Sequence, residues 1–334
     1  MAIRFDDLLN LLPKDTYDRV ERTRKRVNNT VREAIRRETG LMLNRQDSND
    51  PNGDQADISI PITIVPGVPN KLRELRFDDS YAMVLRLSPF RNNLEETKRG
   101  LTGLMPLLRS LEGDGAEMQS VAGPRQAAEL TLNQVVKLLR LLDREDPVRL
   151  VLSVDEDVLG AYIYKLPSRN APDTDPLSGK IELYWGVIGL IAGMLGVSVE
   201  GLTAVVLIHE LAHGYTHLGA DIDGRRWASK CFCESEHALK EGLAQFYTHY
   251  LTNRIENQVP TAHASYQELL KHQPAAYKSH ERWVKKSTPE EIRLAMLRVR
   301  RQGAATISHF QGELWAAHRQ LGSDESEQKT LFQK

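Results

Sequence analysis

The stretch that decides the fold runs from Ala204 to Gly224 and reads AVVLIHELAHGYTHLGADIDG. Five apolar residues lead into His209-Glu210-Leu211-Ala212-His213, a His-Glu-x-x-His pattern. On a helix, two histidines four residues apart lie on one face, one turn from each other, so both imidazoles can bind one ion. We expect this helix to cover about residues 199–218, with Ser198 as its cap.

The apolar lead-in indicates that this helix is buried. From Leu202 onward the residues before the motif are apolar on every side, apart from Thr203. Burying a glutamate and two histidines costs free energy unless something pairs with them, and a divalent cation would pair with all three. The pattern therefore favours a metal site over the alternative, a buried ion pair.

A catalytic zinc site needs a third protein ligand. His217 lies one further turn along the same helix, roughly 6 Å up the axis, so we expect it in the cleft wall rather than on the metal. The segment 231–251, CFCESEHALKEGLAQFYTHYL, predicts a second helix over about 234–253. One face of that helix carries four polar side chains: Glu234, His237, Glu241 and Gln245.

Glu241 is our choice of third ligand, with His237 as the alternative. Gly242 and Ala244 flank Glu241 and permit close approach of another helix, and Glu241 lies inside the helix rather than at its start. A structural zinc site made by Cys231, Cys233 and His237 is less favoured, because the usual spacing is Cys-x-x-Cys with a second distant pair.

The residues HELAH (209–213) followed by KEGLAQFYTHYL (240–251) resemble the glutamate-zincin (gluzincin) metallopeptidases. The resemblance covers roughly residues 150–255. It implies that one zinc ion is bound by His209, His213 and Glu241, and that Glu210 is the general base.

The fold implied by the resemblance is α+β and zincin-like: a mixed sheet, an active-site helix and a helical C-terminal part, here with a helical N-terminal extension. Such sheets have an edge strand that pairs with extended substrate backbone. We expect residues 180–187, KIELYWGV, to be that strand, because it is the last strand before the active-site helix.

Two further roles follow from the resemblance. Many relatives have an Asp four residues after the third ligand that bonds a ligand histidine; here Gln245 takes that place, with less charge assistance. Relatives also supply a downstream Tyr or His that stabilises the oxyanion. The candidates for that role, or for supporting the ligands, are His217, His237, Tyr247, His249, Tyr250 and His309.

The whole chain has 334 residues, of which 41% are hydrophobic, enough for a sizeable core. We divide it into a helical N-terminal extension and linker (1–57), an α/β region (58–147) and a catalytic domain (148–334). Within these, the patterns predict several further elements. They are helices over 5–43, 94–111, 124–143, 187–195, 289–301 and 304–321, and strands over 58–65, 81–88, 148–154 and 160–166.

Composition limits the setting of the protein. The net charge is −1 and no stretch is a convincing membrane span, so we expect a soluble protein without a membrane partner. The chain has two cysteines, Cys231 and Cys233, too few to stabilise a fold through disulfide bonds. This usage suits the cytoplasm.

The expected function is that of a cytoplasmic zinc endopeptidase, a dedicated processing or regulatory protease acting on a protein or peptide. The alternative is a regulatory or nucleic-acid-associated protein with a structural or degenerate zinc site. That alternative would use the helix 18–37, which has eight basic and three acidic residues. The sequence does not predict the oligomeric state.

Overall fold

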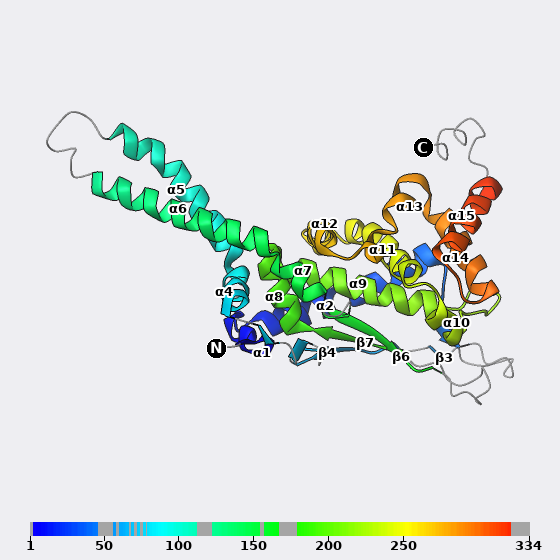
Figure 1. Ribbon diagram of the computed structural model, residues 1–334. Coiled ribbons are helices and arrows are strands. Elements are labelled where there is room, and N and C mark those ends of the chain that lie inside the picture. Colours follow the sequence, from blue (N-terminus) through cyan, green and yellow to red (C-terminus); the bar gives the residue numbers. More distant parts are fainter. Residues whose placement is uncertain are drawn as a thin grey trace.

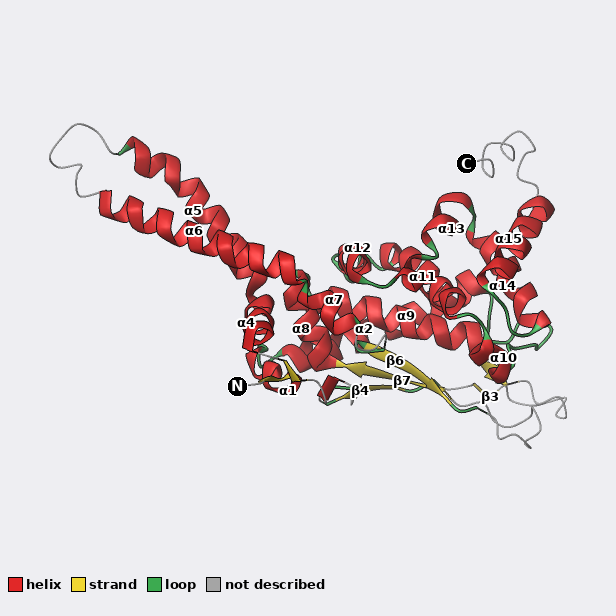
Figure 2. Ribbon diagram, in the orientation of Figure 1, coloured by secondary structure: helices red, strands yellow, loops and turns green. Residues whose placement is uncertain are grey.

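A computed structural model describes residues 3–45, 56–57, 60–66, 68–69, 72–73, 76–77, 79–111, 122–153, 157–166 and 179–321. This part of the chain is α+β: mostly helical, with a small three-stranded mixed sheet and two short strand pairs (Figure 2). Most of the predicted linker 44–57 lies outside the described residues.

The helices form a body and a projecting arm (Figure 1). Those of the body are α1 (Phe5–Leu8), η1 (Leu9–Leu11), α2 (Thr16–Thr39), α4 (Asp79–Leu87), η2 (Ser88–Phe90), α7 (Pro147–Leu152), α8 (Trp185–Leu195), α9 (Val199–Leu218), α10 (Ser229–Glu234), α11 (His237–Arg254), α12 (Ala262–His272), η4 (Ala275–Lys278), α13 (Glu281–Lys286), α14 (Pro289–Gln302) and α15 (Ile307–Leu321). Those of the arm are α5 (Arg91–Ser110) and α6 (Ala122–Glu145).

The three-stranded sheet has the order β4 (Ile62–Val65), β7 (Gly179–Tyr184), β6 (Gly160–Tyr164). β4 is parallel to β7, and β6 is antiparallel to it. The prediction that 180–187 is an edge strand is therefore wrong, because β7 is bonded on both sides. The order of strands along the chain does not determine their order in the sheet, because a segment distant in sequence can pair with the last strand. Here β4 is that segment. The strand next to α9 with a free edge, among those described, is β6.

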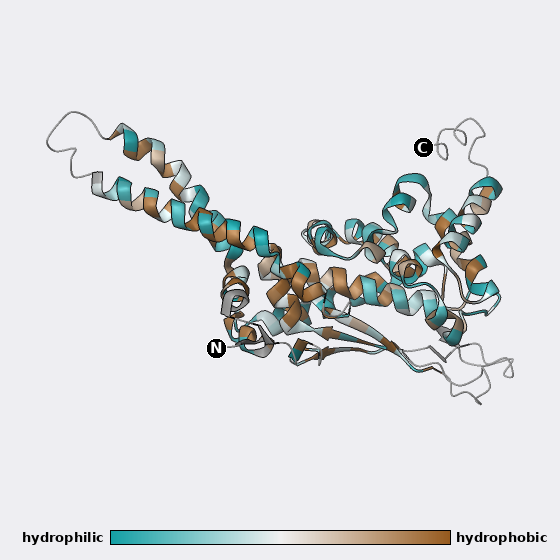
Figure 3. Cartoon of the chain, in the orientation of Figure 1, coloured by the Kyte–Doolittle hydropathy of each residue, from teal (hydrophilic) through white to brown (hydrophobic). Residues whose placement is uncertain are grey.

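α9 is the centre of the body, and every residue in it except Glu200 is buried. Figure 3 shows why: α8 and the first half of α9 are hydrophobic all round, and such helices are stable only inside a core. The predicted cap is confirmed, since the Ser198 hydroxyl accepts a hydrogen bond of 2.9 Å from the Gly201 amide. α2 packs along α9 through an apolar stripe of buried residues, which consists of Val20, Val27, Val31 and Ile35.

The arm is a two-helix antiparallel hairpin that extends away from the body (Figure 1). Its helices match the predicted 94–111 and 124–143. Along each helix the inward apolar residues are spaced by three, four or seven, which is the seven-residue pattern of a coiled coil. These residues are Leu94, Leu101, Met105 and Leu108 on α5, and Ala128, Leu132, Val135, Leu139 and Leu142 on α6.

Two predicted strands are helices instead. Residues 81–88 lie in α4 and its short continuation, and 148–154 overlaps α7. A short apolar run does not distinguish a strand from a buried helix by periodicity alone. For α7 the deciding signal precedes the run: Pro147 occupies the first turn, and the Asp146 carboxylate accepts the Arg149 amide.

The main core draws on all three predicted segments. It includes Val31 from the N-terminal helix, Leu85 from the middle region and Leu207 from α9. In the described part of the chain, no helix is both long enough and apolar enough to span a membrane.

Candidate metal centre

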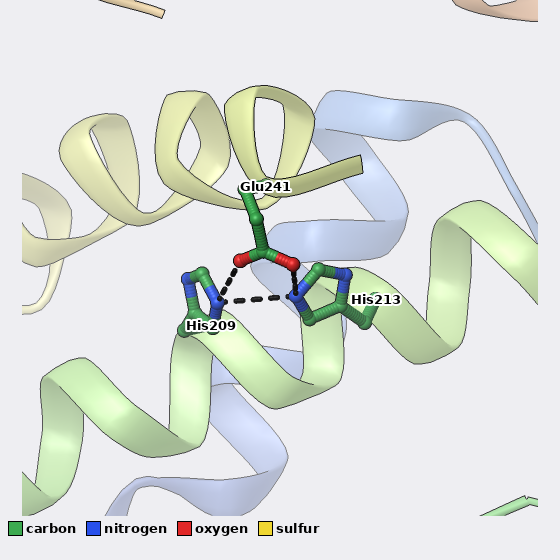
Figure 4. A group of neighbouring side chains, drawn as sticks. All are labelled: His209, His213 and Glu241. Atoms are coloured by element: carbon green, nitrogen blue, oxygen red, sulfur yellow. Dashed lines mark hydrogen bonds and ion pairs between the residues drawn. The ribbon is translucent and has the colours of Figure 1, made fainter. Parts of the chain in front are cut away.

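Three buried side chains from two helices converge on one point (Figure 4). His209 and His213 extend from α9, and Glu241 reaches down from α11, which crosses it. The two Nε2 atoms are 3.1 Å apart. The Glu241 carboxylate lies 3.1 Å from Nε2 of His209 and 3.4 Å from Nε2 of His213. The structure thus brings together the three residues that the sequence selected.

These separations suit a shared metal ion. Two donor atoms that each lie 2.0–2.1 Å from one tetrahedral ion are about 3.3 Å apart. The separation of the two Nε2 atoms, 3.1 Å, is close to that value, and each imidazole has its own carboxylate oxygen nearby: Oε2 at 3.1 Å from His209 and Oε1 at 3.4 Å from His213. Each residue is less than a tenth exposed, so the cost of burying them is offset only by mutual pairing or by a cation. This buried group could hold a metal ion.

Electrostatics hold the three groups in different protonation states. Burial lowers the pKa of His209. Burial also opposes protonation of His213, but the nearby Glu241 carboxylate outweighs it and raises the pKa of His213 to about 9. Burial would raise the pKa of Glu241, but His213 and His209 hold it well below its usual range. A cation held by these groups would displace the proton from His213, so its affinity would depend on pH.

Glu210 lies beside the group, between α9 and β6. Its carboxylate is hydrogen-bonded by the backbone of Tyr162, so the free edge of β6 faces it. Gly160 allows this approach, because a Cβ there would lie 2.6 Å from Val206 and 3.2 Å from the Glu210 side chain. Burial raises the pKa of Glu210 to about 8, so this carboxyl group is poised to exchange a proton near neutral pH.

A cleft of about 290 Å³ opens over these residues. Glu210, His213 and Glu241 form part of its floor. The remaining lining residues are Asp157, Tyr162, Tyr164, Phe232, His237 and Lys240. The cleft therefore gives access to His213, Glu241 and Glu210 from one side.

His217 supports the cleft wall from behind. Its Nδ1 pairs with the Tyr162 hydroxyl and its Nε2 with the Ser229 hydroxyl, both at 2.9 Å. Its ring is stacked on Phe232, with 4.3 Å between ring centroids. With both nitrogens engaged, His217 is not placed to bind the metal, in agreement with the expectation from its helical position.

The other candidate residues fall into two groups. His237 lines the cleft with Nδ1 3.8 Å from Glu241, whereas Gln245 borders a small cavity beside His209 and donates to Gln273 at 3.0 Å. The remaining four do not line the cleft. Tyr247 is fully buried, Tyr250 packs on Phe246, His249 lies against His263 and Tyr266, and His309 is on α15.

Sequence reasoning missed several residues that surround the group. Tyr277 is stacked on the His209 ring with 5.6 Å between centroids. Tyr162 and Tyr164 come from β6, and Asp157 from the turn before it. Alternation along 160–164 does signal a strand with Tyr162 and Tyr164 on one face. However, no local pattern indicates which helix that face meets.

Comparison with known proteins adds no relationship: no protein-family model matches the chain, and neither the curated proteins nor the solved structures contain a match.

Proposed function

We propose that the protein is a zinc-dependent endopeptidase with a zincin-like catalytic fold. The observation that carries the proposal is the buried group of His209, His213 and Glu241 beside Glu210, of which His213, Glu241 and Glu210 line one cleft. Two imidazole nitrogens and one carboxylate, with an open side toward a cleft, are a donor set of catalytic zinc sites.

In this proposal His209, His213 and Glu241 hold the metal. Zinc, when bound, supplies a Lewis acid and lowers the pKa of water toward about 7. Glu210 accepts the proton of the attacking water and returns it to the leaving amine. The Tyr162 amide fixes the Glu210 carboxylate, so that the base stays aligned with the cleft. His237, in the cleft wall, is the candidate donor to the developing oxyanion.

The free edge of β6 is the proposed binding site for the substrate backbone. An extended peptide can add to an exposed strand through main-chain hydrogen bonds, which select for polypeptide without selecting a side chain. Because β6 faces Glu210, a peptide bound there would cross the catalytic group. This role, first expected for 180–187, moves to Gly160–Tyr164.

A dedicated processing or regulatory role in the cytoplasm remains part of the proposal. It is supported by Cys231 and Cys233, which are both free thiols. In the alternative, in which the basic face of α2 binds nucleic acid, several of the eight basic residues in 18–37 already have acidic partners. Arg19 pairs with Glu200, and Arg24 and Lys25 both pair with Glu21.

The test compares wild type with Glu210→Gln and Glu241→Ala. Wild type should bind one zinc per chain and cleave members of an unmodified peptide library, with products identified by mass spectrometry. Glu210→Gln should keep the zinc and lose at least about a hundredfold in rate, the scale of general-base catalysis. Glu241→Ala should lose both.

Glu234→Gln is the matched control, because Glu234 is an exposed carboxylate at the end of α10. It should leave zinc content and cleavage unchanged. Full zinc occupancy in Glu241→Ala would refute the ligand set, and undiminished cleavage by Glu210→Gln would refute the mechanism.

A further inference from the structure

The arm exposes apolar side chains outside its internal core. On α5 these are Leu104, Leu107 and Leu111, of which Leu107 is 55% exposed. On α6 Leu130 is 65% exposed. Exposed leucines scattered singly are ordinary, but four on one two-helix arm are not.

The seven-residue pattern, abcdefg with inward positions a and d, shows that one side of the arm lacks charge. Met105 is at an a position of α5, and Ala128 is at a d position of α6. The g and c positions adjoin d on each helix, and in an antiparallel pair those of both helices lie on the same side of the seam. No charged residue occupies a g or c position in 93–111 or 124–141. We call this side the uncharged face; it consists of Asn93, Thr97, Gly100, Leu104, Leu107 and Leu111 on α5, and Pro124, Ala127, Thr131, Gln134, Leu138 and Leu141 on α6.

The other side of the arm contrasts with this face. Its e and b positions hold Glu95, Arg99 and Arg109 on α5, and Glu129 and Arg140 on α6. On the uncharged face every residue is exposed except Leu138 and Leu141, which are partly buried near the base of the arm. Each helix therefore has two adjacent faces poor in charge: the inward face, whose only charged residue is Lys98 in 93–111 and Arg125 in 124–141, and the free uncharged face. Helices of four-helix bundles have this width of core-facing surface.

Two glycines lie on or beside the uncharged face in the interior of α5. A Cβ built on Gly100 or Gly103 would meet nothing within 4 Å. Each glycine costs about 1 kcal/mol relative to alanine inside a helix, so its presence has no benefit in an isolated hairpin. A glycine does allow another helix to approach closely.

Two residues of opposite charge, Glu96 and Lys137, lie at the same height along the arm, at the border of the uncharged face. The ion pair Arg91–Asp143 at the base and the contact of Met105 with Ala128 set the register of the hairpin. That register puts Glu96 level with Lys137. Both occupy f positions, which border the uncharged face on their own helices, and both are exposed. Neither forms an ion pair within the described part of the chain.

A glycine and a leucine, Gly103 and Leu130, also lie at the same height at the border of the uncharged face. Gly103 and Leu130 lie one heptad from Glu96 and Lys137, respectively, and so occupy the next f positions toward the tip of the arm. In an ordinary coiled coil the a and d positions make the contact between helices, and the g positions flank it. When the g and c positions make the contact instead, the f positions flank it in the same way. A partner helix packed on this face would therefore bring together residues that complement each other in charge, Glu96 and Lys137, and in size, Gly103 and Leu130.

We propose that the uncharged face binds the same face of a second copy of the chain, so that two arms form a four-helix bundle. A two-fold axis along the arms places α5 of one copy against α6 of the other, antiparallel and at equal height. Glu96 then meets Lys137 of the partner copy, and Leu130 of the partner copy packs over Gly103. Because the contact repeats twice, the surface is self-complementary. This inference does not depend on the proposed function.

The experiment measures the mass of the full chain by sedimentation and light scattering over a range of concentrations. Wild type should be a dimer in the micromolar range. Leu107→Lys/Leu130→Lys should be monomeric, with the dissociation constant raised at least about a hundredfold, since two leucines per copy lose their burial. Both side chains are mostly exposed, so the monomer should keep its circular dichroism and melting temperature.

The matched control is Thr102→Lys/Asn133→Lys. It adds the same charges to exposed positions on the other side of α5 and α6 and should remain dimeric.

A charge exchange tests the arrangement. Glu96→Lys and Lys137→Glu should each weaken the dimer at least about threefold, and the double variant should restore it. A monomeric wild type at concentrations of about 100 μM, tenfold or more above the range typical of specific weak dimers, would overturn the proposal. A dimer that survives the leucine changes, or one indifferent to the charge exchange, would overturn it too.

Discussion

Gln245 lies one turn beyond Glu241 on α11, beside the ligand group. Its Nε2 donates to Gln273, which leaves Oε1 facing inward without a partner among the described residues. Nδ1 of His209 is likewise buried without a partner there. Gln245 and His209 border the same cavity of about 30 Å³, the volume of one water molecule. A water there would accept the His209 N–H bond and donate to the Gln245 carbonyl.

Gln245 should therefore orient a metal ligand. Gln245→Leu is expected to weaken zinc binding about 10- to 100-fold, because support of a ligand histidine by a neighbouring acceptor has that magnitude. Competition with a chromogenic chelator measures this. Gln245→Glu should bind at least as tightly as wild type, whereas Gln311→Leu, at an exposed position on α15, should have no effect. Equal affinity of Gln245→Leu and wild type would show that the amide has no such role.

His217 should make stability depend on pH. Burial lowers its pKa to about 3, against 6.5 in the unfolded chain. Between these values the unfolded chain binds a proton that the folded chain does not, so the His217 contribution to stability is complete above pH 6.5 and falls as the pH decreases toward 3.

In urea titrations between about pH 4 and 6, the slope of unfolding free energy against pH should be smaller in His217→Gln. The difference should approach about 1.4 kcal/mol per pH unit, the value for one proton. Glutamine keeps hydrogen-bonding groups for Tyr162 and Ser229, so the variant should fold. An unchanged slope would mean that other groups account for the acid sensitivity.

At the scale of elements, the position of α11 depends on Gly242. A Cβ there would lie 2.3 Å from the Ser279 hydroxyl and 2.6 Å from the Trp283 ring, so α11 and the 279–283 segment are in direct contact. The sequence predicted that Gly242 allows close approach. It did not reveal that the neighbour is this segment, on the side of α11 away from the metal group.

Gly242→Ala should destabilise the protein by about 1–3 kcal/mol, the usual cost of overpacking, and should weaken zinc binding by displacing Glu241. Gly312→Ala is the control: Gly312 is inside α15, with nothing within 4 Å of an added Cβ, and should gain up to about 1 kcal/mol. Urea unfolding measures both. If both variants are stabilised, the contact around Gly242 is not tight.

Helices that have both a clear hydrophobic pattern and a recognisable capping residue could be predicted from the sequence. α9 has an apolar run and a serine cap, and α14 begins with a capping box of Thr288 and Glu291. Elements lacking such signals could not be predicted: 81–88 and 148–154 are short apolar runs, for which a strand and a buried helix are equivalent on hydrophobicity. The order of strands in the sheet depends on β4, far away in sequence, and could not be deduced locally.

At the scale of the molecule, some residues of the site could be predicted from the sequence and others could not. His209 and His213 are related by helical spacing, so sequence alone places them together. Glu241 was chosen from the polar face of its helix and its small neighbours, and the resemblance implied the same residue; the crossing of α9 and α11 that brings it to the histidines is a tertiary contact. β6 and Tyr277 approach the group from segments whose sequences carry no sign of it.

The packing of α2 along α9 has a consequence for synthesis on the ribosome. α2 is held by partners that emerge much later: Arg19 by Glu200, Thr30 by Gln258, and Thr39 through its carbonyl by Arg293. The chain must therefore keep an amphipathic helix without its partners while more than half of the protein is translated. Nascent chains stalled before residue 199 should bind holdase chaperones through α2, and release should follow translation of α9.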